Sequence, residues 1–291
     1  MNYFTIKDIE NLSGIKAHTL RIWEKRYGII TPKRKASKHR FFDNDDLKQV
    51  LRITHLYNNG YKISAIAAMK TNGLNAYETK TALAEDSLIK ILIEATIDLD
   101  EILLHTTLQK AITAFGLEEC MVKVVYPYFE KIGMLWMNNE ALPAQERFAS
   151  NIIVKKLINE IDKLPLSFKS TQPVLILFTP LQEYHEIPLL FMYYMFKKNN
   201  RNICYLGTNT NFEVLDAFIR LNKKCILYFH VITNLTHNSI DDYVQQLLQR
   251  YNDQKIVMSG KLTNAVTVKS ENLKLLHSLD EMVAFGRSVT H

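Results

Sequence analysis

Cationic side chains are concentrated near the start of the chain, at a density that suits contact with a polyanion. Residues 1–75 carry 14 Lys and Arg against 6 Asp and Glu, whereas the rest of the 291 residues carry 22 against 24. The net charge of +6 therefore comes from one module. Such an asymmetry is expected when one module meets the phosphate backbone of nucleic acid and the others do not.

A second candidate for chemistry is Glu183 with His185, in the segment 179–188. A histidine whose second ring nitrogen is held by a carboxylate is a common arrangement for a metal ligand. On spacing alone, an exposed loop histidine near a helix start explains the pair as well. The motifs GxxxxGK[ST], GxSxG and HExxH do not occur, and we expect no enzyme activity.

Cysteine usage and hydropathy limit the class of protein further. Cys120, Cys204 and Cys225 are widely separated and form no CxxC pair. This argues against a disulfide framework or a zinc finger, and for reduced, mostly buried thiols. The sequence contains no run of about 18 apolar residues and does not begin with a basic-then-apolar leader. We therefore expect a cytoplasmic protein with no membrane partner.

Two short amphipathic segments and a basic hairpin must position the cations of the first module. Apolar residues recur every three positions over residues 5–12 and predict a first helix. Ser13-Gly14 ends it, and a second apolar pattern predicts a helix over residues 17–27. Two helices joined by a turn that contains Gly form a helix-turn-helix, whose second helix can enter the major groove of DNA.

The predicted DNA contacts lie on this second helix and on the hairpin that follows it. We expect Arg21 to face bases or phosphates, and Trp23 and Tyr27 to divide between core packing and backbone contact. A basic helical domain that binds a protein or an acidic surface is the alternative. The predicted contact residues are His18, Thr19, Arg21, Trp23 and Tyr27 on the helix, and Lys33, Arg34, Lys38, His39 and Arg40 on the basic wing.

Helical periodicity continues through the middle of the chain. Helices over residues 45–58 and 63–69 complete the first domain, 1–72, and residues 70–73 form a linker. A second domain, 76–164, is predicted to be a four- or five-helix bundle. Its expected helices cover residues 78–85, 88–98, 100–116, 117–137 and 144–163.

From residue 172 onward, short apolar runs alternate with helical segments, which predicts a Rossmann-like parallel sheet in a third domain, 172–291. Expected strands cover residues 174–178, 202–206, 225–229, 255–259 and 273–277, and expected helices cover 187–198, 212–221, 241–250 and 280–287. The predicted fold class is multidomain: a winged helix-turn-helix that is all-α with a small β wing, a central helical bundle, and an α/β domain. Ligands of such sheets bind beyond the carboxyl ends of the strands, where Glu183 and His185 lie.

Residues 3 to about 70 resemble the DNA-binding domain of the MerR family of bacterial regulators. The likeness rests on Phe4-Thr5-Ile6 with Ser13-Gly14-Ile15, on the run TLRIWEKRYG at residues 19–28, and on Pro32, Arg34 and Arg40-Phe41-Phe42. The resemblance implies a two-stranded wing, buttressed by a second helix pair. It also implies a dimer on a two-fold symmetric, palindromic operator in double-stranded DNA.

The predicted bundle and α/β domain resemble the cobalamin-binding module of methionine synthase and its relatives. Joined to a MerR-type head, they resemble the light-responsive, cobalamin-dependent repressors of the CarH and LitR type. That family has Asp-x-His-x-x-Gly where this chain has Glu183, His185 and Pro188. It also has a Trp followed after nine residues by Glu-His, where this chain has Trp136, Glu146 and Arg147.

The resemblance implies roles for these residues. His185 would bind the cobalt of adenosylcobalamin from below, and Trp136 and Glu146 would lie above the corrin. Ser259 and Gly260 stand where the family lines a slot for the nucleotide tail of the cofactor. The implied activity is repression by a homo-oligomer, a dimer or a tetramer, that responds to light or ligand loss.

Some residues depart from the family pattern, because Arg147 replaces the upper His and Pro188 replaces Gly. In the slot for the nucleotide tail, the bulky residues Phe229, His230 and Val231 stand where the family has small ones. Bulky side chains would fill the slot, since a packed interior has few voids. Two hypotheses therefore stay open. In the first, the module binds adenosylcobalamin. In the second, it has kept the scaffold without the cofactor and serves oligomerisation, protein interaction or another ligand.

Overall fold

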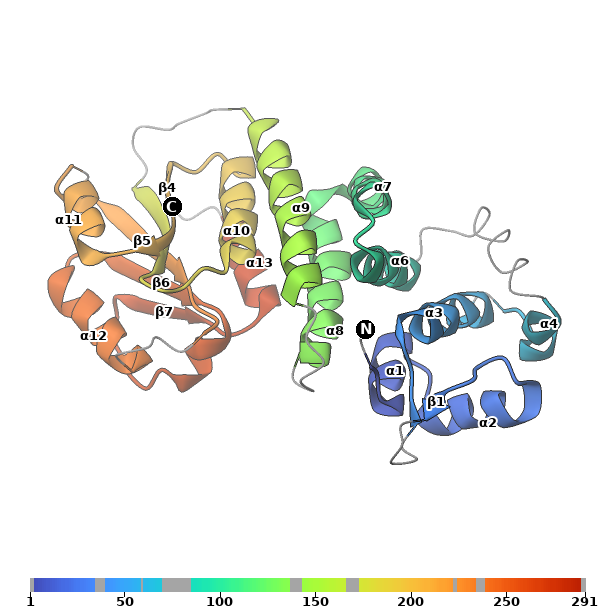
Figure 1. Ribbon diagram of the computed structural model, residues 1–291. Coiled ribbons are helices and arrows are strands. Elements are labelled where there is room, and N and C mark those ends of the chain that lie inside the picture. Colours follow the sequence, from blue (N-terminus) through green and yellow to red (C-terminus); the bar gives the residue numbers. More distant parts are fainter. Residues whose placement is uncertain are drawn as a thin grey trace. The chain divides into compact units, whose positions relative to one another are not determined.

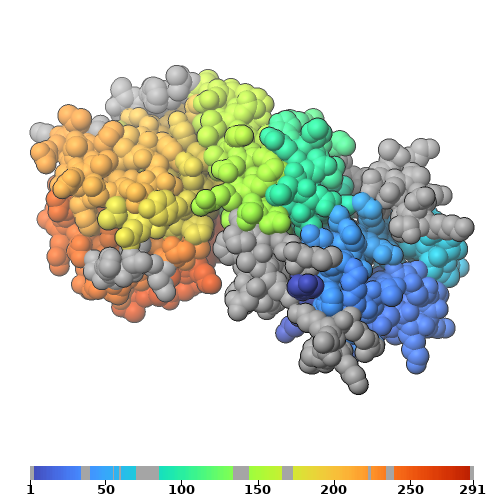
Figure 2. All heavy atoms as spheres, in the orientation of Figure 1, coloured from blue at the N-terminus to red at the C-terminus, as the bar shows by residue number. Residues whose placement is uncertain are grey.

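The computed structural model describes residues 3–34, 40–58, 60–69, 85–136, 143–165, 173–221, 224–233 and 239–288. The chain divides into two compact units, Met1–Ile152 and Ile153–His291, and each is described here by itself. Each unit is one contiguous stretch of the chain, coloured from blue to green in the first unit and from yellow-green to red in the second (Figure 2). The three-domain division expected from the sequence stays a prediction. Within the described ranges, no helix combines the length and apolar character needed to cross a bilayer.

The head of the first unit has the expected order of helices and wing (Figure 1). A capping box between Thr5 and Asp8 starts the first helix, and Gly14, with φ of 77°, ends it in the left-handed region that glycine tolerates. Phe4 exchanges two backbone hydrogen bonds with Phe42, which ties the start of the chain to the wing. The elements are α1 (Ile6–Ser13), α2 (Ala17–Tyr27), β1 (Lys33–Arg34), β2 (Arg40–Phe41), α3 (Asn44–Asn58) and α4 (Ile63–Ala68).

The helical middle follows the predicted pattern where it is described. The expected break at Gly116 is a kink with φ of 75° inside α7, and the helical path then runs on through a π-helical turn. A buried hydrogen bond of 2.7 Å joins the hydroxyls of Thr96 and Tyr128. The expected helix 78–85 lies outside the described residues, save for its last residue. The elements are α6 (Glu85–Asp98), α7 (Glu101–Cys120), η2 (Met121–Val125), α8 (Tyr126–Trp136) and α9 (Pro143–Asp162).

A parallel five-stranded sheet forms the second unit, and every predicted strand is present within a few residues. The strand order is β4-β3-β5-β6-β7, and all pairs are parallel. The strands are β3 (Val174–Pro180), β4 (Ile203–Thr210), β5 (Cys225–His230), β6 (Lys255–Ser259) and β7 (Leu273–Leu276).

Helices cover both faces of this sheet (Figure 1). On one face, α10 (Glu186–Lys198) packs beside α13 (Leu279–Arg287). The other face is covered by α11 (Phe212–Leu221) and α12 (Ile240–Arg250). A short 3₁₀ helix, η3 (Lys261–Ala265), follows β6. The strand order reverses at β3, whose neighbours are β4 and β5. Such a switch point leaves a crevice at the carboxyl ends of the strands, which is where doubly wound folds bind ligands.

Candidate functional site

The outer face of α2 presents the polar side chains expected of a recognition helix. His18 and Arg21 are exposed, as are Lys25 and Arg26. Thr19 and Tyr27 are half-buried. The amino end of α2 is capped by a side chain from α1, because the backbone amide of Ala17 donates to Glu10 at 3.0 Å. The sequence pattern gave no sign of this cap, which fixes the start of the predicted DNA-contacting helix.

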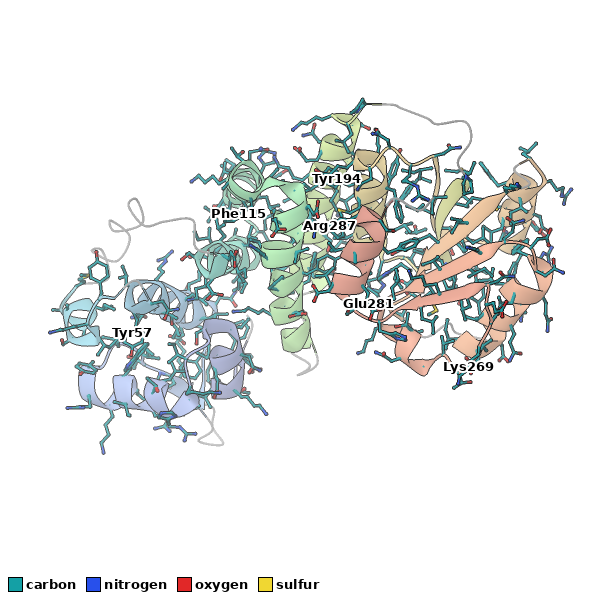
Figure 3. All side chains as sticks on the ribbon, turned by 180° about the vertical axis from the view of Figure 1, so that it is seen from behind. Tyr57, Phe115, Tyr194, Lys269, Glu281 and Arg287 are labelled. Carbon is teal, nitrogen blue, oxygen red and sulfur yellow. The ribbon has the colours of Figure 1, made fainter. Side chains whose placement is uncertain are left out.

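Trp23 lies in the core, and its predicted contact with DNA is corrected. The side chain is only 3% exposed. Its ring meets Tyr57 of α3 edge-on at a centroid distance of 5.1 Å, and Figure 3 labels Tyr57. Of the two roles expected from the sequence, core packing is therefore the one that Trp23 has.

The wing cations that the structure describes have acidic partners within the head. Lys33 Nζ contacts Asp43 and lies 3.9 Å from Asp46. Arg40 Nη2 lies 3.4 Å from a carboxylate oxygen of Glu24 on α2. The side chain of Arg34 and all of Lys38 and His39 lie outside the described residues, so their predicted phosphate contacts stay predictions.

The buried carboxylate of Glu183 joins the loops that follow β3 and β5, at the switch point of the sheet. Its Oε1 accepts hydrogen bonds from the backbone N–H and from the Nδ1 of His185. Its Oε2 accepts from the amides of Ile232 and Thr233, at 2.8 and 2.9 Å, and from the Thr233 hydroxyl at 3.0 Å. Burial by itself would raise the pKa of Glu183, but these hydrogen bonds outweigh it and hold the pKa well below its usual range.

His185 combines a fixed ring orientation with exposure. Its side chain is 48% exposed, whereas that of Glu183 is fully buried. Because Nδ1 bonds Glu183, a metal ligated by His185 would be bound through Nε2. The structure thus brings Glu183 and His185 together as predicted, with the carboxylate behind the imidazole.

The loop that carries His185 is held by residues that the sequence pattern did not single out. The hydroxyl of Thr179 donates to the backbone oxygen of Glu183 at 2.5 Å and accepts from the amide of Asn209 at 3.1 Å. The side chain of Asn209 accepts from the amide of Gln182 at 2.8 Å. Thr179, Asn209 and Thr233 all lie at or after the carboxyl ends of adjacent strands, which was the available signal for finding them.

Ser259 and Gly260 make close contacts within the fold, and their predicted contact with the cofactor tail stays a prediction. The Ser259 hydroxyl is buried and bonds the Tyr228 hydroxyl at 2.6 Å and His230 Nδ1 at 2.8 Å. Gly260 has φ of 104°, and a Cβ there would lie 2.2 Å from the backbone oxygen of Val231. A side chain at position 260 would therefore collide with the backbone at the end of β5.

Pro188 is compatible with the local fold. It lies in the first turn of α10, where proline is tolerated because its missing N–H has no helical partner to lose. Replacement of the family's Gly by Pro188 therefore leaves the helix start and the His185 loop intact.

The residues expected above the corrin belong to the first unit. Glu146 lies in the first turn of α9, half-buried, and accepts a hydrogen bond of 2.8 Å from the Ser150 hydroxyl. Arg147 is exposed, and Trp136 is the last residue of α8, with a side chain outside the described set. His185 belongs to the second unit. Among the described residues, no group of three or more His, Cys, Asp and Glu is placed to hold a metal ion.

Comparison with known families supports both parts of this description. Residues 4–72 match the model of the MerR HTH family regulatory protein, and residues 88–158 match the model of a B12 binding domain. The chain is similar to two proteins of Myxococcus xanthus. The HTH-type transcriptional repressor CarH is 21% identical over 255 residues, 84% of each chain, and CarA is 26% identical over 208 residues, 70% of this chain and 68% of CarA.

A solved structure gives the same fold. The monomethylamine corrinoid protein of Methanosarcina barkeri matches with a TM-score of 0.55 and 16% identity, over 71% of this chain and 100% of that one. At this identity the likeness shows the fold alone. The domain matches and the two repressors give the assignment: the chain is a MerR-type helix-turn-helix regulator with a B12-binding domain, homologous to the CarH and CarA transcriptional repressors.

Proposed function

We propose that this protein is a cytoplasmic transcriptional repressor whose DNA binding is controlled by cobalamin held at His185. The observation that carries the proposal is the buried Glu183 carboxylate, which orients His185 at the switch point of the sheet. Support also comes from the B12-binding domain match and the homology to repressors. The homologues are named transcriptional regulators, and we infer a regulatory rather than a catalytic role.

The residues around His185 are suited to hold a corrinoid. The Glu183 hydrogen bond to Nδ1 fixes the tautomer of His185 and makes Nε2 more basic, which favours metal ligation. Thr233 and the two loop amides hold the carboxylate in turn. When bound, adenosylcobalamin would be held by His185 and would supply a cobalt–carbon bond that light can break.

A second candidate function, without cobalamin, is supported by the contacts at the expected slot for the nucleotide tail. The buried contacts of Ser259 with Tyr228 and His230 leave the expected slot positions filled. A module with a filled slot can act in oligomerisation, protein interaction or sensing of another ligand. Retention of cobalamin by the purified protein after desalting would separate this candidate from the first.

At the DNA, we propose a homo-oligomer, a dimer or a tetramer, on a palindromic operator. His18 and Arg21 would read the major groove from the exposed face of α2. Lys25 and Arg26, which are exposed on the same helix, are further candidates for backbone contact. A two-fold operator is the geometric counterpart of a two-fold dimer.

Arg21→Ala is expected to weaken specific DNA binding about 10- to 100-fold, since one bidentate base contact contributes about 1–3 kcal/mol. The measurement is fluorescence anisotropy with a duplex selected by the wild-type protein from a random-sequence pool. Arg220→Ala, an exposed arginine of the second unit, is the matched control and should bind as the wild type does. Equal affinity of the Arg21 and Arg220 variants would refute the assignment of α2 as the recognition helix.

A further inference from the structure

Lys33 is a cation of the basic wing whose surroundings are acidic. It begins β1 and pairs with Phe41 of β2. Its Nζ contacts Asp43 and lies 3.9 Å from the Oδ2 of Asp46. Asp43 is buried, with 1% of its surface exposed, and follows the wing directly.

The two aspartates are fixed in place because they cap α3. The amide of Asp43 donates to the Asp46 carboxylate and the amide of Asp46 donates to the Asp43 carboxylate, both at 3.0 Å. The backbone carbonyl oxygen of Asp43 also accepts the first helical hydrogen bond, from the amide of Leu47 at 3.0 Å. Neither carboxylate can move away without uncapping the helix.

This arrangement needs a cation. Two carboxylates in one capping box repel each other, and a buried charge that loses its partner is strongly destabilising. Burial raises the pKa of Asp46, and the charge of Lys33 opposes that rise. Lys33 therefore faces two carboxylates, which compete with a phosphate for its charge.

We propose that Lys33 is a positioning residue, which clasps the wing to the start of α3 through Asp43 and Asp46 and makes no phosphate contact. The inference rests on the proposed DNA binding by the head, and it refines the role that the sequence predicted for Lys33. Arg40 differs, because it meets a single carboxylate oxygen at 3.4 Å and its side chain is 41% exposed. A phosphate contact by Arg40 is therefore compatible with its ion pair.

The test compares Lys33→Gln with the double variant Lys33→Gln/Asp43→Asn in the full-length chain. Asparagine can still accept the hydrogen bond from the Asp46 amide, and the double variant restores the net charge of the wild-type cluster. Lys7→Gln, an exposed lysine on α1, is the matched control for loss of one positive charge from the head. Each protein is assayed for thermal unfolding of the head and for binding to a 30-bp duplex of arbitrary sequence over a range of KCl concentrations.

We expect Lys33→Gln to lower the unfolding temperature and to weaken duplex binding by about tenfold, as contacts of the displaced wing are lost. The double variant should regain the wild-type unfolding temperature and a duplex affinity within about twofold of the wild type. Its plot of log affinity against log KCl concentration should have the wild-type slope. A direct phosphate contact predicts the opposite pattern: wild-type stability for Lys33→Gln, a salt slope reduced by about one, and no rescue by Asp43→Asn. That pattern would overturn the proposal.

A further outcome separates this inference from the proposed function. If the wild-type protein binds no duplex at any salt concentration, the proposed function fails. The unfolding temperatures of the single and double variants still decide whether Lys33 and Asp43 form the clasp, because they require no DNA. Absence of rescue in those temperatures would overturn the clasp.

Discussion

Replacement of Glu183 with Ala is expected to lower the free energy of unfolding of the second unit by about 3–5 kcal/mol. The change removes the acceptor for five hydrogen bonds, which come from His185, Ile232 and Thr233. The carboxylate that these donors share is fully buried, so water cannot replace it at no cost. The loops after β3 and β5 should then separate.

Urea unfolding and amide hydrogen exchange measure this effect. The amides of Ile232 and Thr233 should lose protection in Glu183→Ala, and Glu183→Gln should be intermediate because its amide oxygen still accepts. Glu271→Ala, an exposed glutamate of the same unit, controls for the loss of one negative charge. If Glu183→Ala and Glu271→Ala unfold alike, Glu183 does not hold the two loops together.

The stability of the second unit is expected to fall as the pH drops from about 6.5 to about 4, because of His230. Burial lowers the pKa of this histidine from 6.5 to about 4. Between pH 6.5 and pH 4 the unfolded chain binds a proton that the native state excludes. The contribution of neutral His230 to the free energy of unfolding is therefore complete above pH 6.5 and is lost toward pH 4. A shift of this size corresponds to about 3 kcal/mol.

The variant that isolates this effect is His230→Gln, which does not titrate. It should be less stable than the wild type at pH 7.5, because it disturbs the contact with Ser259, but its stability should change less between pH 6.5 and pH 4. His277→Gln removes an exposed histidine and should keep the wild-type pH profile. An unchanged acid slope in His230→Gln would show that His230 takes up a proton as readily in the native state as in the unfolded state.

Much of the fold was predictable because local signals agree with the tertiary structure. The apolar runs at residues 174–178 and 225–229 became β3 and β5, and the apolar spacing of residues 17–27 became α2. Capping chemistry and short apolar runs depend on neighbouring residues, which a sequence shows directly. The order of the strands in the sheet depends on long-range packing and came from the structure.

The candidate site was predictable in part. The spacing of Glu183 and His185 indicated their contact, since only Tyr184 separates them in the chain. The hydrogen bonds from Thr233 to Glu183 and from Asn209 to Gln182 cross from one strand end to another, and no local pattern reports them. The wing shows the same limit: the sequence shows Lys33 as one of several cations, and only the fold places Asp43 and Asp46 around it.

The measurement that tests the central claim most directly is an absorption spectrum of the full-length protein, incubated with adenosylcobalamin in the dark and then desalted. His185→Ala is compared with His277→Ala, an exposed histidine elsewhere in the same unit. We predict that the wild type and His277→Ala retain the cobalamin spectrum and that His185→Ala loses it. A wild-type protein that emerges colourless, or a His185→Ala variant that keeps the wild-type spectrum, would contradict cobalamin binding through His185.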